Sequence, residues 1–351
     1  MLPPRKHTSV DNVAKVTHLS PRTVAGILHG DGRGTSRAVR DRVRLVAERL
    51  GHPAPPDTTL LLVQSETPSF SFLPQALFQG LIEGAHASAC RLEVAIVADA
   101  QLDNEAGLQA LVRERGATGL LLNYHLGYPR ALPELIERLT LPAVWINSLH
   151  RHDCVMPGDF DAAVTVTRHL LALGHRRIAY ADLTNDFTAH VLHHSCLERL
   201  DGYKEAMVEA GREPQFIGVE LPLDANDRRE AVHAALTAAS APTAVIAYCP
   251  RSLMPFYHYA VADLRLSVPG NLSLASFANE GEDIASLDLT RMASPWLDVG
   301  HAAVARLVAR CTQPSKRFDP LMLPLPLLPG VTCGQLRGTE RLSRQDLAPL
   351  R

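Results

Sequence analysis

The side chains best suited to recognition chemistry gather near the start of the chain. The first 56 residues contain ten Lys or Arg and four acids, whereas the remainder contains 25 and 33. Ala25, Gly26 and His29 follow Arg22 at spacings of three, four and seven, which places all four on one face of a helix. A basic segment with donor groups on one helix face suits contact with a polyanion, although such a segment can also be no more than a solvated surface.

Enzyme chemistry has little support. The sequence lacks a phosphate-binding G-x-x-x-x-G-K-[ST] loop, the zinc motif H-E-x-x-H and the nucleophile motif G-x-S-x-G. His190, His193, His194 and Cys196 could form a soft metal site, but their spacing fits no known site and a His-rich loop is the simpler interpretation. The six cysteines lie at least 22 residues apart and are predicted to be reduced thiols. We therefore expect no enzyme, no metal and no cofactor.

Three short helices are predicted to position the basic face. Val10, Val13 and Ala14 belong to the first helix, and a tight turn follows at 17–19. Ser20 offers an N-cap and Pro21 the first position of a second helix that runs to about residue 28. A third helix follows Thr35 or Ser36 and ends at Gly51. This order predicts a helix-turn-helix unit, the alternative being a helical hairpin that only packs on the rest of the chain.

The same residues carry a family resemblance. The stretches SVDNVAKVTHLSPRTVAGILHG and TSRAVRDRVRLVAERLGH resemble the N-terminal domain of LacI/GalR-type transcription repressors. The family's pattern is approximately T-I-x-D-V-A-x-x-A-G-V-S-x-x-T-V-S-R-V-L-N-G, then V-S-x-x-T-R-x-R-V-x-x-A-x-x-L-G-Y. Residues that match in register include the caps and the apolar core: Val13, Ala14, Ser20, Thr23, Val24, Leu28, Gly30, Ser36, Arg40, Val43, Ala47, Leu50 and Gly51.

The resemblance implies that the second helix enters the major groove of DNA. Arg22 is the best candidate for a guanine contact, because its guanidinium can bond O6 and N7 together. Gly26 replaces the family's Arg. This replacement either lets the helix backbone approach DNA closely or reflects sequence drift without a function. His29 can read a base or touch a phosphate. Ser9, Ser20, Arg33 and Arg37 are expected to contact phosphates. The implied interface comprises Ser9, Ser20, Pro21, Arg22, Thr23, Gly26, His29, Arg33 and Arg37.

The linker departs from the family. In the family, the linker usually forms a hinge helix that inserts leucines into the minor groove of DNA. Three prolines in residues 53–56 predict an extended tether instead, so minor-groove wedging is not expected.

From residue 58 the pattern changes to alternating strands and helices. Buried strands are predicted at 60–63, 92–97, 119–122, 143–146, 178–180, 244–247 and 272–276. Amphipathic helices are predicted at 74–89, 103–115, 161–173, 197–210, 227–239 and 297–312. This alternation is typical of doubly wound α/β folds with parallel sheets.

The family resemblance continues through this part. LALGHRRIAYADL, ERLDGYKEAMVEAG and LRLSVPGNLSLASFANE are similar to segments of the family's effector domain, which has periplasmic-binding-protein type I architecture. The implied organisation is a DNA-binding domain at 1–52, a linker at 53–58, and two doubly wound lobes within 59–337. Lobe 1 would comprise about 60–158 and 290–318, and lobe 2 about 159–289 and 320–336. Residues 338–351 are expected to be a loose tail.

A ligand cleft between the lobes is implied by the resemblance. Arg199 stands at the family's ligand arginine, Asn147 stands where sugar-binding members often have Asp, and Asp159 is expected to cap a helix rather than touch the effector. The family's acidic ligand groups are absent, since its A-N-D reads Tyr248-Cys249-Pro250 and its G-F-D-D reads Ser276-Phe277-Ala278-Asn279. Hence the effector is not a plain sugar, or the pocket has lost its ligand. The candidate effector-binding residues are Phe70, Phe72, Asn147, Arg199, Tyr248, Ala278 and Asn279.

Together these features predict a cytoplasmic, sequence-specific DNA-binding regulator, a homodimer or higher oligomer, whose operator affinity a small-molecule effector modulates. The alternative is a small-molecule sensor whose head has lost specific DNA recognition. No membrane partner is expected, because no run of 18 apolar residues occurs and no signal peptide is evident.

Overall fold

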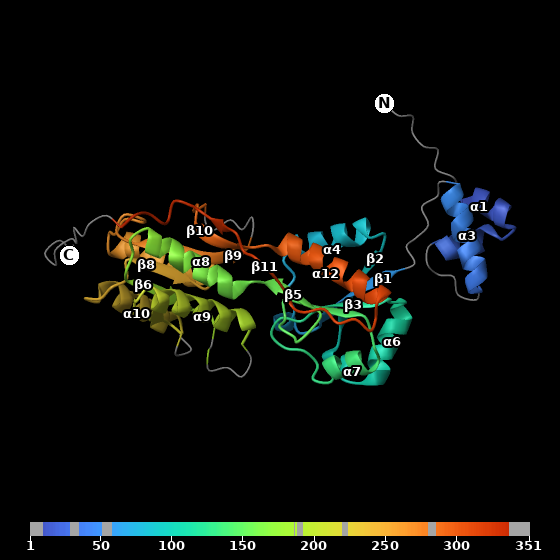
Figure 1. The fold of residues 1–351 in the computed structure, drawn as a ribbon, viewed down its shortest axis with the longest axis horizontal. Helices are drawn as coiled ribbons and strands as arrows, with labels where there is room; N and C mark the ends of the chain where they lie inside the picture. The colour runs from blue at the N-terminus through green and yellow to red at the C-terminus, as the bar shows by residue number, and fades with distance from the viewer. Residues whose placement is uncertain are drawn as a thin grey trace, which may run out of the picture.

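A small helical head precedes two α/β lobes in the computed structural model, which describes residues 10–28, 35–50, 58–185, 187, 192–219, 224–279 and 286–336 (Figure 1). The predicted fold class, a helix-turn-helix head followed by two doubly wound parallel-sheet lobes, is confirmed. No helix among these residues is long and apolar enough to cross a bilayer. The expected linker at 53–58 and the tail at 338–351 lie outside the described residues, save for Thr58.

The head packs three helices around one apolar centre. They are α1 (Val10–Thr17), α2 (Pro21–Leu28) and α3 (Arg37–Arg49). Ser20 caps α2, because its Oγ accepts a hydrogen bond from the Thr23 backbone N at 3.0 Å. The turn before it places His18 at φ +58°, a left-handed conformation that ends α1 sharply. The buried core comprises Val13, Ala14, Val24, Ile27, Leu28, Val43 and Ala47.

The first lobe is a six-stranded sheet in the order β11-β5-β4-β3-β1-β2. Its strands are β1 (Thr59–Ser65), β2 (Arg91–Val97), β3 (Gly119–Asn123), β4 (Ala143–Ile146), β5 (Cys154–Pro157) and β11 (Leu321–Leu323). Its helices are α4 (Gln75–Ala87), α5 (Asp99–Leu102), α6 (Glu105–Arg115), α7 (Leu132–Arg138) and α12 (Trp296–Thr312). Alternate residues of β1 are buried on opposite faces, Leu60 in the core formed with α4 and α12, and Leu61 in the core formed with α6 and α7.

The second lobe is a six-stranded sheet in the order β12-β10-β9-β8-β6-β7. Its strands are β6 (Ile178–Ala181), β7 (Gln215–Ile217), β8 (Ala244–Ala247), β9 (Ser273–Asn279), β10 (Thr290–Ser294) and β12 (Leu327–Leu328). Its helices are α8 (Asp159–Ala172), α9 (His194–Glu209), α10 (Ala225–Thr237) and α11 (Pro250–His258). Helices α8 and α9 share one core with the sheet, whereas α10 and α11 share the other.

The chain passes between the two sheets three times. The crossings run from β5 to α8, from β10 to α12, and from β11 to β12. Two expected lobe limits are therefore wrong: β10 belongs to the second sheet rather than to lobe 1, and β11 to the first sheet rather than to lobe 2. The reason is pairing, since β10 lies parallel to β9 with Thr290 opposite Ala275, and no local sequence pattern reveals that partner.

Candidate functional site: an exposed helix in the head and a pocket between the lobes

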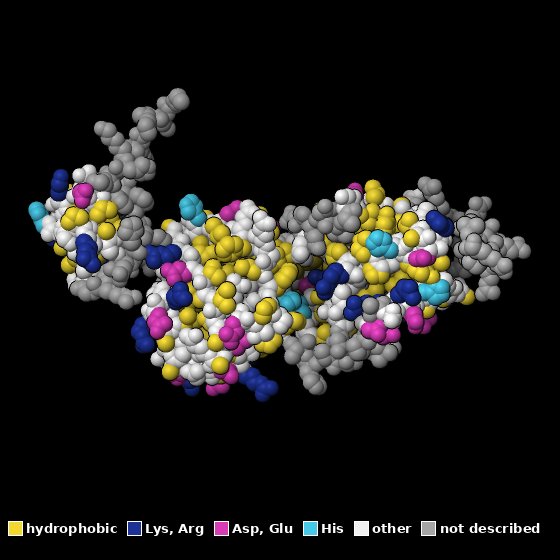
Figure 2. Space-filling model, turned by 180° about the vertical axis from the view of Figure 1, so that it is seen from behind, with side chains coloured by type: hydrophobic (Ala, Val, Ile, Leu, Met, Phe, Trp, Pro, Cys, Tyr) yellow, Lys and Arg dark blue, Asp and Glu magenta, His cyan; other side chains and the backbone are white. Residues whose placement is uncertain are grey.

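The outer face of α2 carries the side chains predicted to contact DNA. Pro21, Arg22 and the capping Ser20 are exposed, and Thr23 and Gly26 are half-buried. Basic side chains lie on the visible face of the head in Figure 2. Three predicted contacts, Ser9, His29 and Arg33, lie outside the described residues. Arg37 begins α3, but its side chain is likewise outside them.

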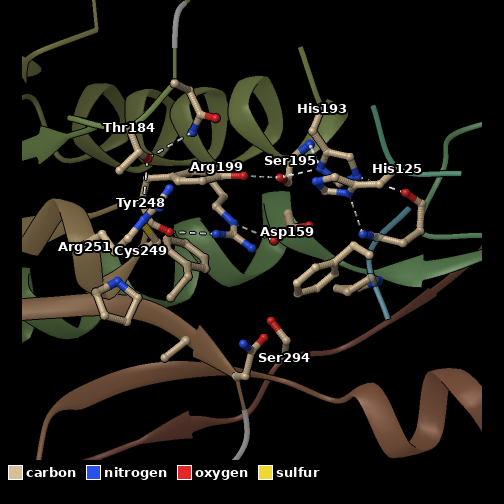
Figure 3. Close-up of a pocket in the computed structure, with 18 of the residues that line it drawn as sticks. His125, Asp159, Thr184, His193, Ser195, Arg199, Tyr248, Cys249, Arg251 and Ser294 are labelled. Carbon is tan, nitrogen blue, oxygen red and sulfur yellow. Dashed lines mark hydrogen bonds and ion pairs between the residues drawn. The ribbon is translucent and has the colours of Figure 1, made fainter. Parts of the chain in front are cut away.

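A pocket of about 440 Å³ lies between the lobes, and the carboxyl ends of strands from both sheets reach it (Figure 3). Asn147 follows β4, Tyr248 follows β8, and Asn279 and Ser294 end β9 and β10. Open parallel sheets bind ligands at this edge, because the loops that leave the strands diverge there. The fold thus builds the pocket where a small molecule is expected to bind.

Arg199 of α9 is the centre of the second-lobe wall. Its Nε donates to Asp159 Oδ1 at 2.7 Å, and its Nη1 donates to the Tyr248 carbonyl at 2.7 Å. The guanidinium carbon lies 4.6 Å from the Tyr248 ring centre and 4.2 Å from that of Phe277. Two hydrogen bonds use two of the five N–H groups, so a clamped cation keeps donors for a ligand.

Asp159 does not have the role expected from the sequence. It was predicted to cap α8, but the N-cap is Gly158 and no side chain caps this helix. Asp159 lines the pocket and is almost fully buried against Arg199. Ion pairing outweighs capping here because a buried carboxylate needs a compensating charge.

Neutral imidazoles join the two lobes at the pocket. His193 Nε2 lies 2.9 Å from the Asn147 carbonyl, and the His193 ring stacks on His125 at 4.1 Å between centres. Asn147 Nδ2 in turn lies 3.2 Å from His125 Nδ1. Burial lowers the pKa of His125 to about 4 and that of His193 well below its ordinary value. Both rings are therefore uncharged at neutral pH and act as hydrogen-bonding groups.

Aromatic side chains form the first-lobe wall. Phe72 packs edge-on against Trp296 with ring centres 5.6 Å apart, and Trp296 Nε1 donates to Asn279 Oδ1 at 2.7 Å. Phe70, predicted to touch the effector, does not line the pocket and packs against the core beneath α6 and α7. The difference from Phe72, two residues later, arises because Phe70 ends a 3-10 turn and its ring packs against the core.

Most predicted effector residues meet at the pocket, and several others had no sequence signal. Phe72, Asn147, Arg199, Tyr248, Ala278 and Asn279 all line it. Sequence reasoning missed several lining residues: His125, Thr184, Asn185, Ser195, Cys249, Arg251, Phe277, Ser294 and Trp296. Some of these could have been found by taking the first residues after each predicted strand, as with His125 after β3 and Thr184 after β6.

One cluster could offer ligands to a metal ion. The ligand atoms of Asp159, His194 and Glu198 lie within 4.8 Å of one another. His193 instead contacts Ser195 and Asn147, Cys196 is buried with a pKa raised to about 11, and His190 lies outside the described residues. Because the Arg199 guanidinium already pairs with Asp159, it would repel a metal cation bound at this cluster. The arrangement is explained without an ion.

Comparison with known proteins identifies the kind of domain. Residues 167–333 match the family described as a periplasmic binding protein-like domain. The HTH-type transcriptional regulator GntR of Escherichia coli (strain K12) is 28% identical over 220 residues, which cover 60% of this chain and 62% of that protein. The match thus spans somewhat less than two thirds of this relative's length.

Solved structures show the same fold. A transcriptional regulator CelR–cellobiose complex has a TM-score of 0.59 at 20% identity, covering 93% of this chain and 100% of that one. The lac repressor dimer bound to operator and the anti-inducer ONPF has a TM-score of 0.61 at 17% identity, covering 94% and 100%. These likenesses extend over the head as well as both lobes.

Proposed function

We propose that this chain, which resembles the LacI/GalR family, is a sequence-specific DNA-binding transcription regulator, and specifically a repressor whose operator affinity changes when a small molecule binds between its lobes. The observation that carries this proposal is the pairing of two features in one chain: an exposed, Ser20-capped α2 with Arg22 on its outer face, and a pocket centred on Arg199.

Helix α2 has the dimensions needed for the major groove. Its eight residues span roughly 12 Å, comparable to the groove width of about 12 Å. Val24, Ile27 and Leu28 face the core, so the opposite face is free to meet DNA. Arg22 would then reach a guanine edge, while Ser20 and Thr23 near the helix start would contact phosphates.

Ligand binding in the pocket can change how the DNA-binding heads are positioned. Beside the chain crossings, the lobes are connected at this site by the His193–Asn147 and Trp296–Asn279 hydrogen bonds and by the stacked rings of His125 and His193. A ligand that contacts both walls binds a closed arrangement better than an open one and therefore shifts the population between them. In a homodimer this shift would alter the separation of two heads, which must match half-sites roughly 34 Å apart.

The proposal includes the absence of catalysis. Burial raises the pKa of Cys154 and of Cys196, which makes their thiols poor nucleophiles. The polar groups of the pocket are engaged with one another as binding groups, as with Arg199 on Asp159. A regulator of this kind acts where the DNA is, in the cytoplasm.

Selection of bound duplexes from a random pool tests this function. The full chain should enrich one palindromic consensus, and Arg22→Ala should relax one base pair in each half-site by about 1–3 kcal/mol. Arg113→Ala, which removes an exposed positive charge from α6, is the matched control and should leave the consensus unchanged. Sequence-independent, salt-sensitive binding by the unmodified chain would favour instead a sensor whose head has lost specific recognition.

A further inference from the structure

The charges that line the pocket do not balance. Among the described residues that line it, Asp159 is the acidic one, and its charge is already matched by Arg199. Arg251 is a second cation in the lining, and its side chain is exposed. With His125 and His193 neutral, the described part of the lining therefore carries an excess positive charge at neutral pH.

Arg251 and Arg199 belong to the same wall. Arg251 is the second residue of α11, directly after Cys249 and Pro250, and Figure 3 draws it beside Tyr248 and Cys249 on the side of Arg199. Tyr248 connects the two, since its carbonyl accepts from Arg199 and it stands three residues before Arg251. An anionic group placed at this wall could receive charge-assisted hydrogen bonds from both guanidinium groups.

The remaining lining suits a hydroxylated or flat body. Asn147, Asn185 and Thr184 bring polar atoms to the lining, although Thr184 Oγ1 and Asn185 Nδ2 already donate to the buried Asp182 carboxylate at 2.9 and 2.7 Å. Phe72 with Trp296 offers an apolar face. At Ala278 and Asn279 the lining has a methyl group and an amide, so no carboxylate accepts hydroxyl protons there. Such a lining favours a ligand that brings its own negative charge over a neutral polyol.

We propose that the effector is a small anion, a hydroxylated compound bearing a carboxylate or a phosphate, whose charged group lies against Arg251 and Arg199. This inference rests on the proposed role of the pocket as an effector site. Arg251 is a specificity residue in this account, because its charge discriminates the anion from its neutral parent. The carboxylate and phosphate versions share this chemistry and differ in size and charge.

The test is a matched panel measured by thermal shift and calorimetry on the full chain. The probes are glucuronate, galacturonate, glucose 6-phosphate and galactose 6-phosphate, each against its neutral parent sugar, with inorganic phosphate alone as a further arm. We expect at least one anionic probe to bind and its parent to bind at least tenfold more weakly. Binding of the hexuronates alone would assign a carboxylate ligand, and binding of the hexose phosphates alone would assign a phosphate ligand. If no anionic probe binds, or if a parent sugar binds as tightly, the inference is overturned.

Arg251 variants give the second arm. Arg251→Gln should weaken the bound anion at least tenfold and leave the parent sugar unaffected, whereas Arg251→Lys should keep part of the affinity. Because this side chain is exposed, both variants should fold with an unchanged melting temperature. Unchanged anion affinity in Arg251→Gln would contradict the assignment. Binding to the selected DNA is measured separately, so that loss of DNA recognition would refute the proposed function while leaving the anion site standing.

Discussion

Arg199 Nε and Asp159 Oδ1 lie 2.7 Å apart, although one residue belongs to α9 and the other begins α8. The carboxylate side chain is 1% exposed and the guanidinium 11% exposed. The pair therefore does two things at once. It neutralises a buried charge and fixes the guanidinium between Tyr248 and Phe277 at the pocket wall.

Removing one partner of this pair should be costly. Arg199→Ala leaves a buried, uncompensated carboxylate and is expected to lower the free energy of unfolding by roughly 3–5 kcal/mol. The double variant Arg199→Ala with Asp159→Asn should recover part of that loss, since the stranded charge is gone. Urea unfolding of Arg199→Ala, Asp159→Asn and the double variant measures this, and a loss in the double variant equal to the sum of the two single losses would show that the side chains do not depend on each other.

Glu198 should make stability depend on pH. Burial, with the Asp159 charge, raises the pKa of Glu198 to about 7 from its usual 4.5. The folded state therefore holds a proton that the unfolded state releases. This contribution is fully present below pH 4.5 and is lost as the pH rises through 7.

Glu198→Gln removes that dependence. The stability of the variant relative to the unmodified chain should rise by roughly 1–2 kcal/mol between pH 5 and pH 8, less than the full shift implies because the side chain is partly exposed. Taking the difference in stability between the two proteins cancels the contribution of the histidines. Their lowered pKa values make stability rise with pH over this window, opposite to Glu198. A difference that stays constant with pH would mean that Glu198 ionises normally.

Gly300 allows α12 to approach α4 closely. A Cβ at this position would lie 2.6 Å from the Leu77 carbonyl oxygen and 2.7 Å from the Leu81 backbone N. Since these are backbone atoms, Gly300→Ala must move a helix and should cost about 1–3 kcal/mol. Gly84→Ala is the control in the same helix pair, because its Cβ would meet only the Val304 side chain at 3.1 Å or more. Equal melting temperatures for the two variants would contradict this account of the packing.

Local patterns predicted the elements that have strong signals of their own. Ser20 and Pro21 mark the start of α2, and the apolar run 244–247 coincides with β8, because capping chemistry and burial on both sheet faces leave direct traces in sequence. Helices α7 and α11 and the strands β5, β7, β10, β11 and β12 were not among the predicted elements. Most of these are short, and a stretch such as Leu321–Leu323 becomes a strand only by pairing with β5.

A pocket residue could be predicted from the sequence where it directly follows a predicted strand. Its role could not be predicted where a residue far away in the sequence determines that role. Asn147 was identified because it follows the run 143–146 at a position where sugar-binding members of the resembled family often have Asp. Asp159 was assigned to a helix cap because its sequence neighbours show a helix start, whereas Arg199, forty positions later, determines what it does. Arg251 had no signal at all, since α11 was not predicted.

Recognition of DNA by α2 is the central prediction for this protein. The direct measurement is the base preference of the full chain and of Arg22→Ala in duplex selection, with Arg113→Ala beside them. We predict one consensus for the unmodified chain and for the Arg113 variant, and a relaxed position in each half-site for the Arg22 variant. An identical consensus in all three proteins, or enrichment of no sequence by any of them, would contradict it.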